Sequence, residues 1–251
     1  YIYRMGANHA SHDFLKDIFT RRVKEKRHIR SGIRSGKISF KGVTMKIGKK
    51  SIFDNLNWVI EPKQTVVLTG PNGIGKSLSM QLLVQVYKPV SGTITIDNLD
   101  ISRIDRSYLR QKVVYSNQDT NLLGDTILKN ILYTNDTKTV QDVNRLLTAY
   151  NLAFSKNLDT PVDVEGKNIS GGDRRLITIL RTLLKKDDAA IFIFDEPLAA
   201  LEVTRKEAVW NMIKKETAGK TLVVVSHTDT ILNTCTDNCN VVNFRNLIYS
   251  T

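Results

Sequence analysis

The sequence contains no apolar run of the roughly 18 residues that a helix needs to cross a membrane. Its longest apolar runs, AAIFIF and TLVVV, have the length of buried strands. Cysteine is scarce as well, and two residues in 251 exclude a disulfide-rich scaffold. Cys235 and Cys239 lie four residues apart, but no recognisable set of further metal ligands flanks them, so we expect ordinary reduced thiols.

Acidic residues are scarce at one end of the chain only. Residues 1–50 hold 14 Lys and Arg against 3 Asp and Glu, which accounts for +11 of the net charge of +12. Residues 8–30 are predicted to form a basic, weakly amphipathic helix, and the SGIRSG that follows to form a flexible joint. Such a basic segment suits a solvated linker, a membrane surface or an arm for nucleic acid, and the charge alone leaves these open.

The whole chain of 251 residues is 41% hydrophobic and is long enough for one large domain or two small ones. Alternating polar and apolar residues at 38–47 and 51–60 predict antiparallel strands. Apolar runs typical of buried parallel strands then alternate with helical periodicity, with strands expected at 65–70, 113–116, 190–195 and 221–225, and helices at 78–87, 174–186 and 202–216. This order predicts an α/β fold with a parallel sheet and an antiparallel β flank.

Residues 70–77, GPNGIGKS, fit the pattern G-x-x-x-x-G-K-[ST] in full. Glycines let backbone N–H groups turn toward phosphate oxygens, and the helix that follows offers its positive N-terminus to the same anion. Lys76 is expected to reach the β- and γ-phosphates of a nucleotide and Ser77 to ligate Mg²⁺. The alternative, a chance match in an ordinary loop, is weakened by the predicted strand and helix on either side.

Two acids, Asp195 and Glu196, end the apolar stretch IFIFDEP. Ligands bind at the carboxyl edge of a parallel sheet, so we expect Asp195 to hold the Mg²⁺ shell and Glu196 to polarise an attacking water. Solvated acids that merely cap a strand are the alternative. His227 and Gln118 follow strands in the same way, although a lone histidine is more often structural. SGGD at residues 170–173 precedes a helix and makes a second N-terminus that favours anions.

Over roughly residues 37–245, these stretches together resemble the ATP-binding domain of ABC transporters. GPNGIGKS matches the family's P-loop, Gln118 its Q-loop glutamine, and NISGGD, residues 168–173, its LSGGQ signature. IFIFDE matches the strand with the Mg²⁺ aspartate and the catalytic glutamate, and His227 matches the switch histidine. The order and spacing of all five agree with the family. The stretch from 91 to 133 looks like the exporter branch, and the first 30 residues resemble the end of the transmembrane domain in mitochondrial half-transporters linked to iron–sulfur cluster assembly.

The resemblance implies a P-loop NTPase core with a parallel sheet, an antiparallel β flank and a helical signature subdomain at residues 37–251. Residues 1–36 would be a basic linker helix that follows a transmembrane domain. ATP and Mg²⁺ are the implied cofactors. The implied partner is a second ATP-binding domain in a head-to-tail homodimer, where each nucleotide lies between the P-loop of one copy and the signature of the other.

By matching positions, the resemblance assigns three groups of residues. The catalytic group is Glu196, His227 and Gln118, and the metal group is Ser77, Gln118 and Asp195. The nucleotide-binding group is Ile47, Asn72, Gly73, Ile74, Gly75, Lys76, Ser77, Leu78, Ser170, Gly171 and Gly172. The resemblance also implies a membrane location through the transmembrane domain, in an inner membrane of mitochondria or of an organelle derived from them. It assigns no transported substrate, because this family selects its cargo in transmembrane helices.

Some positions depart from the family's pattern. Ile47 stands where an aromatic residue usually stacks on adenine, so we expect a loss of about 0.5–1.5 kcal/mol of binding and looser base selectivity. Leu78 replaces Thr after the P-loop, Asp173 replaces Gln at the end of the signature, and Glu202 replaces Asp after the catalytic acid. Since the catalytic set itself is intact, we expect ATP hydrolysis coupled to export.

Two other functions stay open at this stage. One is a soluble ABC protein that acts on nucleic acid or ribosomes, which the basic N-terminal segment would serve. Such proteins usually carry two ATP domains or long coiled coils, and neither is present, so we do not expect nucleic acid as a partner. The other is a subunit that binds nucleotide with little hydrolysis, which the substitutions at Ile47, Asp173 and Glu202 would favour.

Overall fold

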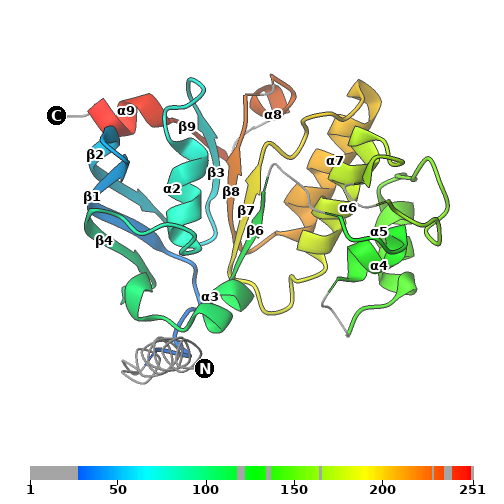
Figure 1. Ribbon diagram of the computed structural model, residues 1–251, viewed down its shortest axis with the longest axis horizontal. Coiled ribbons are helices and arrows are strands. Elements are labelled where there is room, and N and C mark those ends of the chain that lie inside the picture. Colours follow the sequence, from blue (N-terminus) through cyan, green and yellow to red (C-terminus); the bar gives the residue numbers. More distant parts are fainter. Residues whose placement is uncertain are drawn as a thin grey trace, which may run out of the picture.

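The computed structural model describes residues 28–117, 122–133, 137–163, 166–227, 229–234 and 239–249. These residues form an antiparallel sheet, a parallel sheet and a group of helices, arranged from one end of the molecule to the other (Figure 1). The α/β fold with a parallel sheet and an antiparallel flank is therefore confirmed.

The antiparallel sheet has the strand order β2-β1-β4-β5. Its strands are β1 (Ile38–Ile47), β2 (Lys50–Ile60), β4 (Ser91–Ile96) and β5 (Leu99–Asp100). In the register of β1, Phe40 lies opposite Trp58 of β2 and Ile94 of β4, and all three side chains are buried. The alternation read from the sequence thus gives this sheet one apolar face that packs on the core.

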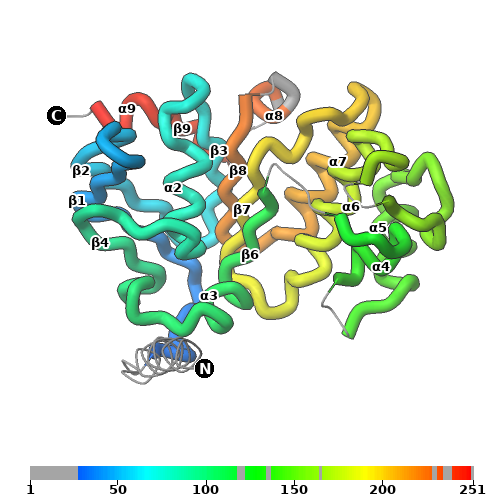
Figure 2. Tube along the Cα trace, in the orientation of Figure 1, coloured from blue at the N-terminus to red at the C-terminus, as the bar shows by residue number. Residues whose placement is uncertain are grey.

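The parallel sheet has the strand order β6-β7-β8-β3-β9. Its strands are β3 (Thr65–Thr69), β6 (Val113–Ser116), β7 (Ile191–Asp195), β8 (Thr221–Val225) and β9 (Cys239–Asn243). Segments far apart in the sequence lie side by side here, as β3 does between β8 and β9 (Figure 2). Because every neighbouring pair is parallel, the carboxyl ends of all these strands meet at one edge.

Successive residues of the parallel strands enter two different cores. On β3, Val66 and Leu68 pack with the antiparallel sheet and α2 (Lys76–Leu83), whereas Val67 packs with the helices of the other half. On β7, Ile191 and Ile193 join the first core, and Phe192 and Phe194 the second. Both faces of the sheet are therefore covered, which explains its continuous apolar runs.

The helices of the second core lie beyond β6 and β7 (Figure 1). They are α4 (Ile127–Leu132), α5 (Val140–Ala149), α6 (Gly171–Leu183) and α7 (Val203–Glu216). The remaining described helices are the 3₁₀ turn Ile101–Arg103, α3 (Arg106–Lys112), α8 (Asp229–Thr234) and α9 (Phe244–Tyr249). Within the described ranges, no helix has both the length and the apolar character to cross a membrane.

From residue 28, where the described residues begin, the N-terminal stretch differs from the predicted helix and flexible joint. Residues 8–27 of the predicted helix lie outside the described residues, and 28–30 are not helical, since Ile29 forms a parallel bridge with Ile104. Residues 31–36, expected to be a flexible joint, are instead held against the domain. Ile33 is buried, and Asp97 accepts backbone N–H bonds from residues 34–37.

Two further differences concern element ends and cysteine. Helix α2 ends at Leu83, four residues before the predicted end, and Gln85 beyond it has a φ of 56°. The expectation of reduced thiols is wrong for Cys239, which is disulfide-bonded in the structure, while Cys235 lies outside the described residues.

Candidate functional site

The candidate site is a cavity of about 550 Å³ at the carboxyl edge of the parallel sheet. Three neighbouring strands contribute to it, because β3 leads into residues 70–77, β7 ends at Asp195, and β8 leads into His227. The predicted residues that line it are Ile47, Asn72, Gly73, Gly75, Lys76, Ser77, Leu78, Asp195, Glu196 and His227. The fold thus brings together residues from four distant parts of the sequence.

The glycine loop has a shape that only glycine fits at one position. Gly75 is the N-cap of α2 and has a φ of 110°. A Cβ atom there would lie 2.9 Å from Ile52 and from Phe53, so even the smallest side chain would collide with β2. The loop therefore bends around open space above the first turn of α2, where backbone N–H groups favour an anion.

Lys76 lies inside this loop, with a side chain that is only 6% exposed. Its Nζ donates hydrogen bonds to the carbonyl oxygens of Gly70 (2.7 Å) and Pro71 (2.9 Å). Burial lowers the pKa of Lys76, and the Glu196 and Asp195 carboxylates oppose that shift. The loop thus holds a cation at its centre, facing the two acids of β7.

Asp195 is the last residue of β7 and is 2% exposed. Its Oδ2 accepts a hydrogen bond from the Tyr115 hydroxyl at 3.0 Å, while its Oδ1 is buried with no hydrogen-bond partner in the described protein. A buried carboxylate oxygen without a donor is costly unless a cation or water satisfies it. This orphaned oxygen, on the same cavity as the Ser77 hydroxyl, fits the oxygen ligands that Mg²⁺ prefers.

Glu196 follows Asp195 in a strained backbone conformation, with a φ of 49°. Its N–H donates to the Val225 carbonyl of β8 (2.9 Å), the Ser226 hydroxyl donates to its Oε2 (3.4 Å), and the His227 Nε2 lies 3.2 Å from its Oε1. Burial raises the pKa of Glu196, although His227 and Lys76 partly offset this. The result is a carboxyl held toward the cavity and poised to accept a proton more readily than an exposed one.

The remaining walls of the cavity are largely apolar and partly exposed. Ile47 and Ile52 come from the hairpin of β1 and β2, and Leu78, Gln81 and Tyr87 come from α2 and the segment after it. The exposed fraction of Ile47 is 55%, so it offers an open aliphatic surface. This wall has the character of a site for a flat, largely apolar group beside a charged one.

The signature residues do not line this cavity. Ser170 is the N-cap of α6, where its hydroxyl accepts from the Asp173 N–H at 3.1 Å. Gly171 and Gly172 form the first turn of α6, and both Ser170 and Gly171 are exposed. The described chain therefore carries two separate places with the features of an anion site, the cavity and the exposed start of α6.

Asp173, the departure from the family's pattern, has a structural place in this turn. It is 1% exposed, and its carboxylate accepts from the Ser155 N–H (3.1 Å) and from Arg205 Nη1 (3.1 Å) on α7. Arg205 also donates to the carbonyl oxygen of Ala153. The carboxylate is thus fully paired and ties α6 to α7 and to the loop before the signature.

Besides the signature residues, Ile74 is a predicted residue that does not line the cavity, and several residues that do line it were not foreseen. Gln118 lies outside the described residues, and Ile74 packs on the core beneath the loop. Tyr115, the partner of Asp195, sits in β6 as an ordinary strand residue, so no sequence signal marks it. Gln81 lies on the cavity because of its position on α2, and Tyr87 because of the turn after α2, which the sequence pattern did not predict.

Comparison with known proteins agrees with this geometry. The model of the family described as ABC transporter matches residues 53–199, more than half of the chain. The ATP-binding cassette sub-family B member 6 of Xenopus tropicalis is 33% identical over 207 residues, and the ABC transporter B family member 19 of Arabidopsis thaliana is 34% identical over 200. These alignments cover 80% and 76% of this chain, which spans only 24% and 16% of the length of those relatives.

Among solved structures, that of a bacterial Atm1-family ABC exporter with ATP bound is similar with a TM-score of 0.77. The match covers 91% of this chain and 42% of that chain at 24% identity, so it shows the shared fold. The family match, the two relatives and the loop with its facing acids lead to one assignment. The chain belongs to the ABC transporter family, as an ATP-binding domain of that family.

Proposed function

We propose that the chain is the ATP-hydrolysing domain of an exporter half-transporter and works as a pair of copies. The observation that carries the proposal is the single cavity that joins Lys76, Asp195 and Glu196 at the edge of the parallel sheet. A buried cation, a carboxylate with an unpaired oxygen and a carboxyl of raised pKa can serve phosphoryl transfer to water, as phosphate binder, metal ligand and base.

Lys76 binds the terminal phosphates in this proposal. Its amine exchanges its contacts with the Gly70 and Pro71 carbonyls for phosphate oxygens, or shares them, without leaving the loop. The N–H groups around Gly73 and Gly75 and the N-terminus of α2 add donors directed at the same anion. The triphosphate is thus oriented by groups that are already in place before it binds.

Ser77 and Asp195 are the described residues that would hold Mg²⁺, and Gln118 is the third candidate. When bound, the ion supplies positive charge against the phosphate oxygens. The Tyr115 hydroxyl fixes one carboxylate oxygen of Asp195, which leaves the other turned to the cavity. Support from a neighbouring hydrogen bond of this kind orients a metal ligand.

Glu196 acts as the general base that takes a proton from the attacking water. Its strained backbone and its contacts with Ser226 and His227 fix where the carboxyl points. The raised pKa brings this base closer to the operating pH, where proton transfer is most efficient. His227, whose side chain is 42% exposed, then contacts both Glu196 and the cavity.

The cavity is completed by a second copy. Because Ser170, Gly171 and Gly172 are absent from the cavity's own walls but form a helix start whose first residues are exposed, they contact the nucleotide held by the partner's loop. ATP would then join two copies, and hydrolysis would release them.

The assignment to an exporter is narrower than the family membership and is part of the proposal. It is supported by the exporter-like stretch at 91–133 and by the fold shared with the bacterial exporter. In this proposal residues 1–36 connect the domain at 37–251 to a transmembrane domain, which places the protein at a membrane. The nucleic-acid alternative depends on basic residues that lie mainly outside the described part of the chain.

The proposal is tested by steady-state release of phosphate from Mg·ATP. We expect the unaltered chain to hydrolyse ATP, Glu196→Gln to bind ATP but lose at least about 100-fold in turnover, and Lys76→Ala to lose most affinity for the triphosphate. Hydrolysis by Glu196→Gln at the unaltered rate would show that Glu196 is not the base. Tight ATP binding without turnover in the unaltered chain would favour a subunit that binds nucleotide without hydrolysing it.

A further inference from the structure

Tyr87 is an exposed aromatic residue on the wall of the candidate nucleotide cavity. It is 46% exposed, and among the described residues that line the cavity it is the only Phe, Tyr or Trp. An aromatic ring beside a cavity offers a large, rigid surface on which a flat ligand can stack.

The backbone brings the segment that carries Tyr87 beside the strand that carries Ile47. The segment after α2 runs alongside β1, since the Val90 N–H donates to the Thr44 carbonyl at 2.9 Å. Ile47 follows three residues after Thr44 on the same strand. Both side chains line the candidate nucleotide cavity.

Helix α2 separates Lys76, its first residue, from Tyr87, which follows its C-terminal end. With eight residues and a rise of about 1.5 Å per residue, the helix extends about 12 Å from Lys76 toward Tyr87. A ligand whose phosphates contact Lys76 must extend along the face with Leu78 and Gln81 to reach Tyr87. The part of a nucleotide farthest from its terminal phosphate is its base.

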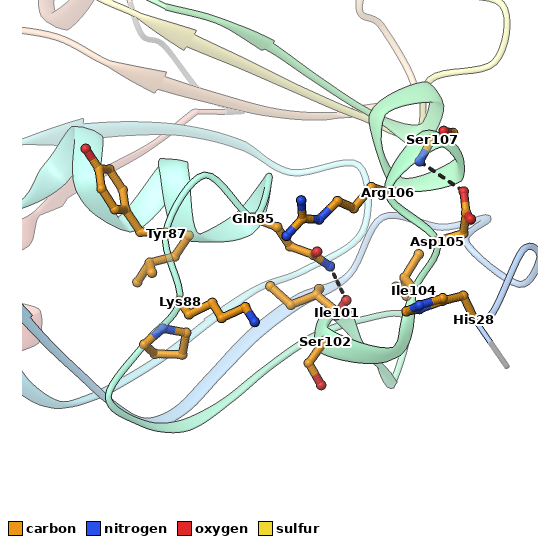
Figure 3. Close-up of a pocket in the computed structure, with 12 residues that line it drawn as sticks. His28, Gln85, Tyr87, Lys88, Ile101, Ser102, Ile104, Asp105, Arg106 and Ser107 are labelled. Carbon is orange, nitrogen blue, oxygen red and sulfur yellow. Dashed lines mark hydrogen bonds between the residues drawn. The ribbon is translucent and has the colours of Figure 1, made fainter. Parts of the chain in front are cut away.

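Tyr87 also borders a second cavity, of about 590 Å³, on the other side (Figure 3). In that view its ring projects away from Ile101, Ser102 and His28, on the side of α2. Tyr87 is thus shared by the linings of the two cavities.

We propose that Tyr87 supplies the aromatic contact to the nucleobase that Ile47 does not supply in this chain. This inference rests on the proposed nucleotide site. The ring stacks on the base, Ile47 and Leu78 add apolar contact, and the Gln81 amide lies on the same wall with a donor and an acceptor for the edge of the base. The chain thereby regains base affinity from a different element.

The test measures binding of two probes by calorimetry: ATP, which has a base, and inorganic tripolyphosphate, which has none. We expect Tyr87→Leu to weaken ATP binding by about fivefold to tenfold and to leave tripolyphosphate binding unchanged. Tyr87→Phe should retain ATP affinity within about twofold because the ring remains. Tyr249→Leu, at an exposed tyrosine outside the cavity lining, serves as the matched control.

A second variant separates stacking from a general disturbance of the wall. Adding Ile47→Tyr to Tyr87→Leu should recover most of the lost ATP affinity. Equal ATP affinity in Tyr87→Leu and the unaltered chain, or equal loss for both probes, would overturn the role of Tyr87. If the unaltered chain binds neither probe while Lys76→Ala behaves identically, the nucleotide site itself is wrong.

Discussion

At the scale of single residues, Glu196 and Gly75 both have a positive φ, 49° and 110°. Gly75 adopts this region without strain, but Glu196 carries a side chain and is held there by the Val225 carbonyl. Strain at Glu196 turns the carboxyl toward Ser226 and His227 rather than along β7. The position of the Glu196 carboxyl, the proposed base, therefore depends on contacts across the edge of the sheet and not only on the sequence around it.

Gly75 and Gly73 lie in the same loop but differ in the space around them. We expect Gly75→Ala to destabilise the protein by about 3 kcal/mol or more, because it adds a collision with Ile52 and Phe53 to the strain of a positive φ. Gly73→Ala, with a φ of 75° and no atom within 4 Å of the added Cβ, should cost only about 1 kcal/mol. Urea unfolding measures both, and equal losses would contradict the collision.

Residues of the site were predictable where chemistry and spacing coincide. The loop around Lys76 and the acids at the end of β7 could be found from the sequence. Ligands of a parallel sheet bind where its apolar strands end, so the residues that follow such a run are site candidates. Tyr115 and Ser226 could not be assigned their partners, since strand register decides which side chains meet across β6, β7 and β8. Whether the predicted residues perform their assigned roles stays a prediction.

At the scale of elements, a buried ion pair joins α6 to α7. The side chain of Asp173 is 2% exposed and that of Arg205 is 23% exposed, with 3.1 Å between Oδ1 and Nη1. Removing the cation leaves a buried carboxylate with only the Ser155 N–H as a partner. The helix that carries the signature is thereby coupled to the helix that follows β7.

We expect Arg205→Met to destabilise the protein by about 2–4 kcal/mol, since an unpaired buried charge is costly. Asp173→Asn should cost less, about 1–2 kcal/mol, because Arg205 can still reach water. In a double-mutant cycle by urea unfolding, the double variant should be more stable than the sum of the single losses predicts. Additive losses would show that the two side chains do not interact, and Lys206→Met on α7 is the control.

A second link between elements is the turn between β4 and β5. Asp97, in this turn, accepts N–H bonds from Arg34, Ser35, Gly36 and Lys37, which attach the N-terminal stretch to the domain. Burial raises the pKa of Asp97, but the Ser35 hydroxyl and the backbone N–H groups outweigh it, so the net pKa is lowered. The carboxylate therefore contributes stability above the ordinary Asp pKa and loses it as the pH falls through the lowered value.

Asp97→Asn should cost about 1–2 kcal/mol near neutral pH, discounted for the exposure of the turn, because the amide accepts fewer of these bonds. The loss relative to the unaltered chain should shrink as the pH falls below about 4, from the ordinary Asp pKa toward the lowered pKa of the folded protein. Urea unfolding at several pH values measures this difference. Asp54→Asn, which removes an exposed acceptor of one Ser51 hydroxyl bond, should show almost no loss, and a pH-independent difference at Asp97 would contradict the account.

Strands with a continuous apolar run could be predicted from the sequence, and strands without a clear hydrophobic pattern could not. β3, β7 and β8 are buried on both faces, so their apolar runs are unmistakable. β9 lies at the edge of the sheet with mostly exposed side chains, and its sequence CNVVN gives no such signal. The prediction of a flexible joint at 31–36 is wrong for another reason. Asp97, whose carboxylate holds this stretch, is about 60 residues away in the sequence, so the local sequence SGIRSG does not indicate the contact.

At the scale of the whole molecule, the loop and the signature lie in different halves. The loop belongs to the half with the antiparallel sheet and α2, and the signature to the half with α4–α7 (Figure 1). One copy therefore presents an open cavity and a separate exposed helix start, and neither encloses a triphosphate alone. In the proposed dimer, a twofold axis would bring the loop of each copy to the signature of the other.

The most direct test of this account is the mass of Glu196→Gln in solution, by size exclusion with light scattering, with and without Mg·ATP. The account predicts a monomer alone, a dimer with ATP, and no dimer when Ser170→Arg is added, because the signature then cannot approach the partner's phosphate. An ATP-bound Glu196→Gln that stays monomeric, or a dimer that forms equally well with Ser170→Arg, would contradict it.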